Sequence, residues 1–285
     1  MKNELELILA ALIWGCAFVA QSVGMEYIGP WTFNCVRFLI GGATLSVLKP
    51  LLDKVRGGRP RFDNPKMLYL GGAACGCALA AASLAQQTGI IGSTVGKAGF
   101  ISALYVVIVP FFSLLMGKKV PWKIIFCALL ACAGLYLLSM SGSASLTLSD
   151  LYLLAGAALF AVHILVIDHF APLCDGIRMS SLQFYTAGLL SLPGMLFIEH
   201  PQLSQIIDAA LPVLYAGVLS CGAAYTLQIV GQIGADPSMA GILLSLESVF
   251  SVLAGWVILH QTLSLRELAG CALMFAAILL VQKLQ

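Results

Sequence analysis

A single acidic residue, Glu247, lies deep inside one of the long apolar stretches of the sequence, and it is the first candidate for chemistry. It follows about eight residues of the stretch that begins at Met239, roughly 12 Å along a helix and near the middle of a bilayer. An unpaired charge at that depth costs at least about 2.5 kcal/mol. Glu247 is therefore expected to be paired, protonated or open to a wet cavity. It either contacts substrate or couples to protons, or it hydrogen-bonds between helices as a structural group.

Arg37 is the second charged candidate, and Asn34 lies three residues before it on the same predicted helix face. Arg37 is about a turn and a half from the expected membrane edge, so its guanidinium binds a substrate carboxylate, pairs with Glu247 or snorkels outward. Lys97 opens another apolar stretch at the membrane edge, where it either binds substrate or faces the interface. These residues form the charged part of the predicted substrate-binding site.

Polar residues recur at helical spacing in three otherwise apolar stretches, which indicates helix faces turned away from lipid. They are Tyr225, Gln228 and Gln232 in one stretch, Ser83 and Gln87 in a second, and Gln183 and Thr186 in a third. Each face either lines a cavity or hydrogen-bonds to a neighbouring helix. We predict that Tyr225, Gln228, Gln87 and Gln183 contact substrate.

Three aromatic residues, Trp14, Tyr105 and Trp256, lie well inside their apolar stretches. Their flat apolar surfaces either wall a pocket or pack against neighbouring helices, and we include Trp14 and Tyr105 in the predicted site. Pro110 removes a backbone hydrogen bond in the middle of its stretch, which either kinks the helix or leaves a carbonyl free.

Neither a cofactor nor a resident metal ion is expected. His163 and Asp168 lie about a turn and a half apart on one predicted helix, but a third ligand is distant and Asp168-His169 is expected at the exposed cytoplasmic rim. The nine cysteines lie mostly in apolar stretches, where Cys packs as a small hydrophobic residue. No Gly-x-x-x-x-Gly-Lys-Ser/Thr loop occurs in the sequence, so ATP hydrolysis is not expected and any flux would have to follow gradients. No catalytic residue is predicted.

The composition of the chain predicts the secondary structure that holds these residues. Of 285 residues, 60% are hydrophobic and 10% charged, against roughly 25% charged in soluble domains. The apolar stretches are continuous and rich in Ala, Leu and Gly, which favours helices over a β-barrel. An all-α integral membrane fold with about ten transmembrane helices is therefore expected. The predicted spans are 5–23, 31–51, 67–88, 93–116, 122–140, 151–168, 179–198, 209–232, 239–260 and 267–283.

The distribution of basic residues predicts the orientation. If both termini are cytoplasmic, little beyond Arg266 lies outside. The cytoplasmic basic residues are then Lys2, Lys49, Lys54, Arg56, Arg59, Arg61, Lys66, Lys118, Lys119, Lys123, Arg178 and Lys283. Lys and Arg resist translocation, so this imbalance predicts an N-in, C-in protein of the cell (inner) membrane. The basic loop between Lys49 and Lys66 is alternatively a lipid or partner site.

Two stretches of the sequence are similar to one another. Residues 98–104, followed by 115–119, are similar to residues 240–246, followed by 258–261, and each pair precedes one further apolar span. Two repeats are therefore predicted, 1–141 and 142–285, with five helices each. Because five is odd, the second repeat enters the membrane from the opposite side, and such inverted halves are typical of transporters that work by alternating access.

The same residues resemble a known family. The run 244–250, the pair Gly255-Trp256 and the break at His260-Gln261 resemble the end of an EamA-type domain of the drug/metabolite transporter superfamily. The first half has a matching version in 99–110, Gly117-Lys118 and Trp122, and residues 11–15 and 30–38 fit as well. The resemblance covers nearly the whole chain.

The resemblance implies a ten-helix protein that exports or exchanges amino acids or other small metabolites. Two departures limit what it implies. The family's Leu-Gly-Glu break is here Gly117-Lys118-Lys119 and Leu259-His260-Gln261. The membrane-embedded Glu of small multidrug transporters is replaced by Ile13-Trp14-Gly15, so their proton-coupled mechanism is not implied.

We therefore predict a secondary transporter for a small, amino-acid-like metabolite, with possible proton coupling at Glu247. The alternatives are an intramembrane enzyme, a drug exporter of the same fold, or a receptor or scaffold without transport. The expected partners are the small-molecule substrate and the lipid bilayer, with no nucleic acid. The protein is expected to be a monomer or a homodimer.

Overall fold

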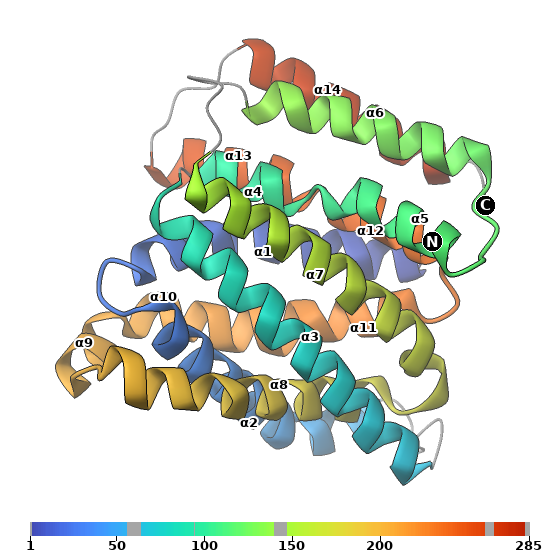
Figure 1. The fold of residues 1–285 in the computed structure, drawn as a ribbon. Coiled ribbons are helices and arrows are strands. Elements are labelled where there is room, and N and C mark those ends of the chain that lie inside the picture. The colour runs from blue at the N-terminus through green and yellow to red at the C-terminus, as the bar shows by residue number, and fades with distance from the viewer. Residues whose placement is uncertain (1, 56–63, 94, 140–146, 260–264, 283–285) are drawn as a thin grey trace.

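The computed structural model describes residues 2–55, 64–93, 95–139, 147–259 and 265–282, and every regular element among them is helical (Figure 1). The first half contains α1 (Lys2–Gly24), α2 (Pro30–Val55), α3 (Pro65–Ile91), α4 (Val95–Ser102), α5 (Tyr105–Leu115) and α6 (Trp122–Ser139). The second half begins with α7 (Leu148–Phe170), η1 (Ala171–Leu173), α8 (Gly176–Gly194), η2 (Met195–Glu199) and α9 (Leu203–Asp208). It continues with α10 (Ala210–Leu214), η3 (Tyr215–Tyr225), α11 (Thr226–Gln232), α12 (Pro237–Leu244), α13 (Glu247–Leu259) and α14 (Leu265–Gln282).

Eight segments of the described chain are long and apolar enough to cross a membrane. They are Asn3–Gly24, Pro30–Pro50, Pro65–Ile91, Val95–Leu115, Leu148–Leu173, Gly176–Glu199, Ala210–Gln232 and Pro237–Ile258. Two shorter apolar segments, Trp122–Gly134 and Leu268–Ala277, lie in α6 and α14. The chain is therefore a multi-pass membrane protein, and the total of ten spans stays a prediction.

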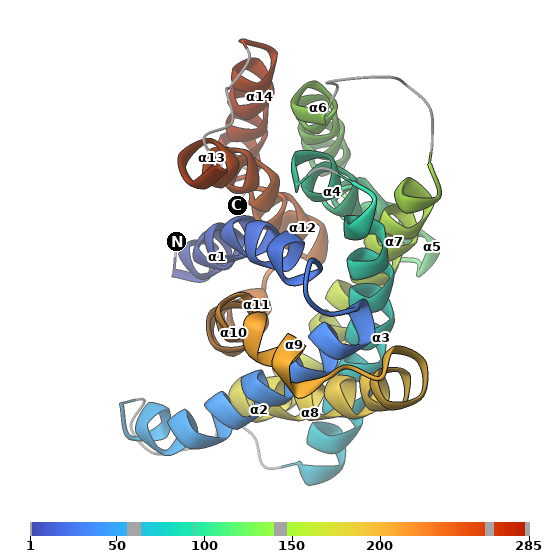
Figure 2. The same cartoon turned by 90° about the vertical axis from the view of Figure 1, so that its left-hand side faces the viewer.

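Helix pairs from the two halves of the chain pack side by side. α2 lies along α8, α3 along α7, and α6 along α14 (Figures 1 and 2). α1 packs against α13 on one side and against η3 and α11 on the other (Figure 2). The two halves are thus interleaved, and the core lies between them.

Side-chain caps begin several helices at the breaks between apolar stretches. Thr147 and Asp150 form a reciprocal capping box at the start of α7, and Asp236 accepts hydrogen bonds from the first amides of α12. Glu199, at the end of η2, accepts from the backbone amides of Trp31 and Thr32 at 2.9 and 2.7 Å. Such caps satisfy amides that have no partner within their own helix.

Two predicted continuous spans are broken in mid-course. The span predicted at 93–116 consists of α4 and α5, separated at Ala103-Leu104, and the span predicted at 239–260 consists of α12 and α13, separated at Ser245-Leu246. The first break precedes Pro110, which lies inside α5. At the second break the Ser245 hydroxyl donates to the Ile242 carbonyl at 2.7 Å, an interaction that competes with the backbone pattern and bends helices.

The two broken helices cross each other at glycines. The Ser248 hydroxyl of α13 donates to the Gly99 carbonyl of α4 at 2.9 Å, and a Cβ added to Gly99 would meet Ser251 Oγ at 2.7 Å. On the other side of the crossing, Gly241 of α12 faces Val106 of α5. Small residues permit this close approach of backbones inside a membrane.

Gly15 gives a direct test of how tightly α1 packs on α13. A Cβ at this position would lie 2.3 Å from Phe250 Cβ and 2.8 Å from backbone atoms of Phe250 and Ser251, so Gly15→Ala forces the two helices apart. Such overpacking costs about 1–3 kcal/mol, and we expect the unfolding midpoint of the detergent-solubilised protein to fall by several degrees.

Gly96→Ala is the matched control, because a Cβ on Gly96 has no heavy atom within 4 Å. Its unfolding midpoint should stay at or above that of the parent, since Ala favours helix. Equal midpoints for the Gly15 and Gly96 variants would contradict the close packing of α1 on α13.

Candidate functional site

A narrow chamber lies at the centre of the bundle, between α1, the two broken helices and η3. Its cavity volume is about 30 Å³. Its walls are formed by Trp14, Phe18, Gln21, Arg37, Gln86, Tyr105, Phe160, Ile164, Ser220, Tyr225, Gln228, Leu244 and Glu247. As it stands, the chamber admits no more than about two or three water molecules.

Glu247 and Tyr105 meet across the chamber at the two helix breaks. Each is the first residue of the helix that follows its break, Tyr105 in α5 and Glu247 in α13. The Tyr105 hydroxyl donates to Glu247 Oε1 at 2.9 Å, and both side chains are buried. Tyr105 directly follows the stretch 98–104, and Glu247 directly follows the similar stretch 240–246. The two residues therefore occupy corresponding positions in the two halves of the sequence.

Arg37 enters the chamber from α2 and is 2% exposed, so it does not snorkel outward. One terminal nitrogen, Nη1, donates to Gln21 Oε1 at 3.2 Å, while Nε and Nη2 have no hydrogen-bond partner in the described chain. The guanidinium lies 5.5 and 4.7 Å from the ring centroids of Phe33 and Phe38. The suggested ion pair between Arg37 and Glu247 is wrong: within the described residues the carboxylate hydrogen-bonds to Tyr105 instead.

Aromatic rings form the wall beside these charged groups. Trp14 and Tyr225 pack edge to face with centroids 4.6 Å apart, and Tyr225 also packs against Phe184 at 5.7 Å. The Trp14 indole nitrogen and Gln228 Oε1 are both buried without a hydrogen-bond partner in the described chain. The chamber therefore combines apolar walls with a few polar atoms that a bound molecule can satisfy.

The other predicted site residues lie outside the chamber. Gln183 pairs with His163, with 3.0 Å between Oε1 and the imidazole Nε2. Lys97 forms an ion pair with Asp150 at 2.8 Å. Asn34 and Gln87 are fully buried, but neither side chain lines the chamber.

Two residues that share the polar and aromatic patterns but were not assigned to the site also lie outside the chamber. Gln232 donates to the Ile164 carbonyl at 3.4 Å, and Trp256 is half exposed on the outside of the bundle. Of the predicted site residues, the structure brings Glu247, Arg37, Tyr105, Tyr225, Gln228 and Trp14 together in the chamber walls and places the others elsewhere. Contact of any of them with substrate stays a prediction.

Several chamber residues escaped the sequence analysis. Phe18 and Gln21 lie four and seven residues after Trp14 and so share its helix face, a spacing that could have found them. Gln86 lines the chamber and donates to Ser102 Oγ at 3.0 Å, whereas the predicted residue was its neighbour Gln87. One position along a helix rotates a side chain by about 100°, so the choice between adjacent glutamines depends on how α3 is rotated.

Comparison with known proteins shows the family and the fold of the chain. The sequence profile of the EamA-like transporter family matches residues 2–140 and 147–282. An uncharacterized transporter from Archaeoglobus fulgidus is 30% identical over 279 residues, covering 98% of this chain and 85% of that protein. A protein of known crystal structure, 20% identical, superposes with a TM-score of 0.79 over 99% of this chain and 96% of its own, which shows a common fold.

The helical bundle and its enclosed chamber therefore define a multi-pass membrane transporter. The chain belongs to the EamA-like transporter family, within the drug/metabolite transporter superfamily.

The half-satisfied guanidinium of Arg37 leads to a stability prediction. A buried polar group without a partner costs about 1–3 kcal/mol, so Arg37→Met, which keeps the apolar stem, should leave the unfolding midpoint unchanged or raise it by several degrees. Thermal unfolding in detergent measures this effect.

Arg178→Met serves as the control for removing a cation, because Arg178 lies at the start of α8 outside the chamber, and its midpoint should barely move. A fall of several degrees for Arg37→Met alone would mean that the guanidinium holds the fold together.

Proposed function

We propose that the protein is a secondary transporter that exports or exchanges a small, zwitterionic, amino-acid-like metabolite through the central chamber. The observation that carries the proposal is the presence of a buried guanidinium and a buried carboxyl group, Arg37 and Glu247, in the walls of one enclosed space. Burying either group in a membrane is costly unless the group is paired, and such residues mark substrate or ion pathways.

The free edge of Arg37 matches a substrate carboxylate. Nε and Nη2 lie on one side of the planar guanidinium, and together they donate two parallel hydrogen bonds to a carboxylate. Because the other side, at Nη1, is held by Gln21, the fork is oriented before substrate arrives.

Glu247 is suited to the opposite end of the same molecule. A substrate ammonium group donates to the carboxylate in place of, or beside, the Tyr105 hydroxyl. The faces of Trp14 and Tyr225 favour both a cation and an apolar side chain between the two charged ends.

Alternating access of two inverted halves accounts for how the substrate leaves. The proposed halves are residues 1–141 and 142–285, with ten spans and both termini cytoplasmic in the cell (inner) membrane. The packing of α2 on α8 and of α6 on α14 supports this symmetry, because each of these helices then packs on its own counterpart. The narrow chamber is consistent with a state closed at both ends, so the helices must move for substrate to enter.

An enzyme is a weaker candidate for this chamber. Among the described residues its walls hold Glu247 as the carboxylic acid and no histidine or cysteine, so an acid–base pair there would have to use Tyr105 or Tyr225 beside Glu247.

Transport by Glu247→Gln in proteoliposomes tests the proposed role of the carboxylate. The amide keeps the hydrogen bond to Tyr105 but loses its charge, and a charged hydrogen bond is worth about 1.5–3 kcal/mol, so uptake of labelled amino acids should fall about tenfold or more. A loss at every pH identifies a charged substrate contact, and a loss of the pH dependence alone identifies proton coupling.

Glu26→Gln is the matched control, because this exposed glutamate lies outside the chamber and its variant should transport like the parent. Unchanged transport by Glu247→Gln at all pH values removes the carboxylate from the site.

A further inference from the structure

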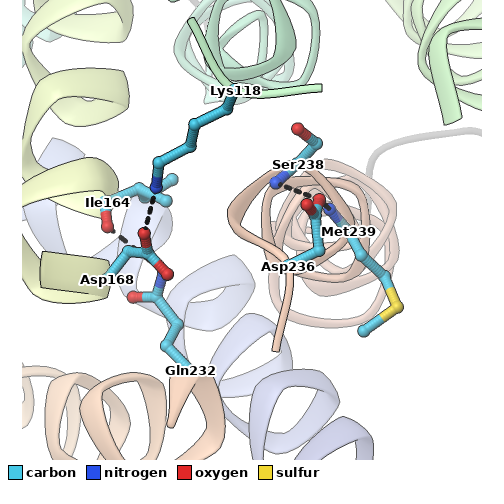
Figure 3. Close-up of polar contacts among 7 residues, drawn as sticks. All are labelled: Lys118, Ile164, Asp168, Gln232, Asp236, Ser238 and Met239. Atoms are coloured by element: carbon cyan, nitrogen blue, oxygen red, sulfur yellow. Dashed lines mark hydrogen bonds and ion pairs between the residues drawn. The ribbon is translucent and has the colours of Figure 1, made fainter. Parts of the chain in front are cut away.

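The broken helix α4–α5 is fastened to α7 at both of its ends by ion pairs. Near its start, Lys97 Nζ lies 2.8 Å from Asp150 Oδ2, in the first turn of α7. Beyond its end, Lys118 Nζ lies 2.5 Å from Asp168 Oδ2, near the last turn of α7 (Figure 3). In both pairs the cation comes from the broken helix or the turn that follows it, and the carboxylate from the continuous one.

The two ion pairs lie on opposite sides of the chamber. Asp150 and Asp168 are separated along α7 by roughly 27 Å at 1.5 Å per residue. Phe160 and Ile164, which line the chamber, lie between them. On α4–α5 the break before Tyr105 likewise falls between Lys97 and Lys118.

The pair at Lys118 lies at the end of the bundle where the chain begins. Asn3 of α1 donates to the Ile233 carbonyl just after α11, and Gln232 donates to the Ile164 carbonyl one turn before Asp168. In Figure 3 Gln232 lies beside Asp168, while Asp236 turns to the first amides of α12. The Lys118–Asp168 pair therefore lies at the end of the bundle where both broken helices meet α7.

We propose that Lys118–Asp168 and Lys97–Asp150 are the latches of two opposed gates, one at each end of the chamber. The break at Ala103-Leu104 is a joint about which α4 and α5 can swing separately, so the tether at the far end of each piece decides whether that piece stays closed. Release of Lys118–Asp168 opens the chamber toward the end that carries the N-terminus. Release of Lys97–Asp150 opens it toward the opposite end.

The strength of the pairs suits reversible gating. Exposed or half-exposed ion pairs contribute little net stability, so thermal motion breaks them often. The Lys118 and Asp168 side chains are 44% and 20% exposed, whereas Asp150 is 1% exposed and also accepts the Thr147 amide. The Lys118 latch is therefore the easier of the two to release.

Labelling of a cysteine placed in the chamber tests the latches. Ser220→Cys reports access, and a membrane-impermeant maleimide is added to vesicles of either orientation, with labelling counted above that of the parent with its native cysteines. Lys118→Gln should speed labelling from the N-terminal side about fivefold and leave the other side unchanged, and Lys97→Gln should do the reverse. Lys123→Gln, an exposed lysine outside both pairs, should change neither rate.

A double-mutant cycle identifies the pair as the cause. Lys118→Gln combined with Asp168→Asn should label like either single variant, because the pair is already broken. Asp168→Asn alone breaks the same ion pair from its other partner and is the second variant at this end. At the opposite end, Lys97→Gln breaks the pair without changing Asp150, so the capping box of α7 stays intact. The proposal is overturned if labelling rises equally from both sides, or if it rises in none of the latch variants.

The inference rests on the proposed function, but the two fail differently. Labelling reports access to the chamber without substrate. Side-specific labelling with no amino-acid transport by the parent would retain the latches and reject the substrate class. Transport by the parent with unchanged labelling in every latch variant would reject the latches and retain the substrate class.

Discussion

The cost of exposing backbone and charge to lipid is the constraint on which the rest of this structure depends. Each unsatisfied polar group costs several kcal/mol in hydrocarbon, so a helix can break in mid-membrane only where protein covers the break. α4–α5 and α12–α13 meet this condition by crossing at their own breaks. Ser248 donates to the Gly99 carbonyl and Tyr105 to Glu247, so each broken helix supplies a partner to the other. The chamber forms where these two breaks cover one another.

The two broken helices share a backbone plan but differ in side chains, and this difference makes the two sides of the chamber unequal. A Cβ on Gly99 would meet Ser251 Oγ at 2.7 Å, whereas the nearest atom to a Cβ on the corresponding Gly241 lies at 3.8 Å. α4 is therefore held more tightly on α13 than α12 is on α5. The looser crossing involves α5, which leads to the more exposed Lys118–Asp168 pair, so the packing and the ion pairs both favour opening at the same end.

Much of the fold and about half of the site could be predicted from the sequence, and the failures have physical causes. Composition and apolar stretches locate the spans, because lipid demands long apolar helices. Glu247 and Arg37 were found because charge inside an apolar stretch is conspicuous. The helix breaks were missed because Ala103-Leu104 carries no turn signal. The ion pair of Lys97 was missed because its partner Asp150 is distant in sequence and only the packing of α4 on α7 brings them together.

The unpaired atoms of the chamber suggest an orientation for the substrate that we propose. Among the fully buried, unpaired side-chain atoms of the described chamber residues, Arg37 contributes two donor nitrogens, Trp14 a third donor and Gln228 one acceptor. These donors match the anionic end of a ligand, so for the amino-acid-like substrate that we propose the carboxylate would lie at Arg37 and the ammonium at Glu247. To reach that position the ammonium must compete with the Tyr105 hydroxyl, which also joins α5 to α13. Under the proposed function, a bound zwitterion would weaken the contact that holds the two broken helices together, and this would link occupancy of the chamber to movement of its walls.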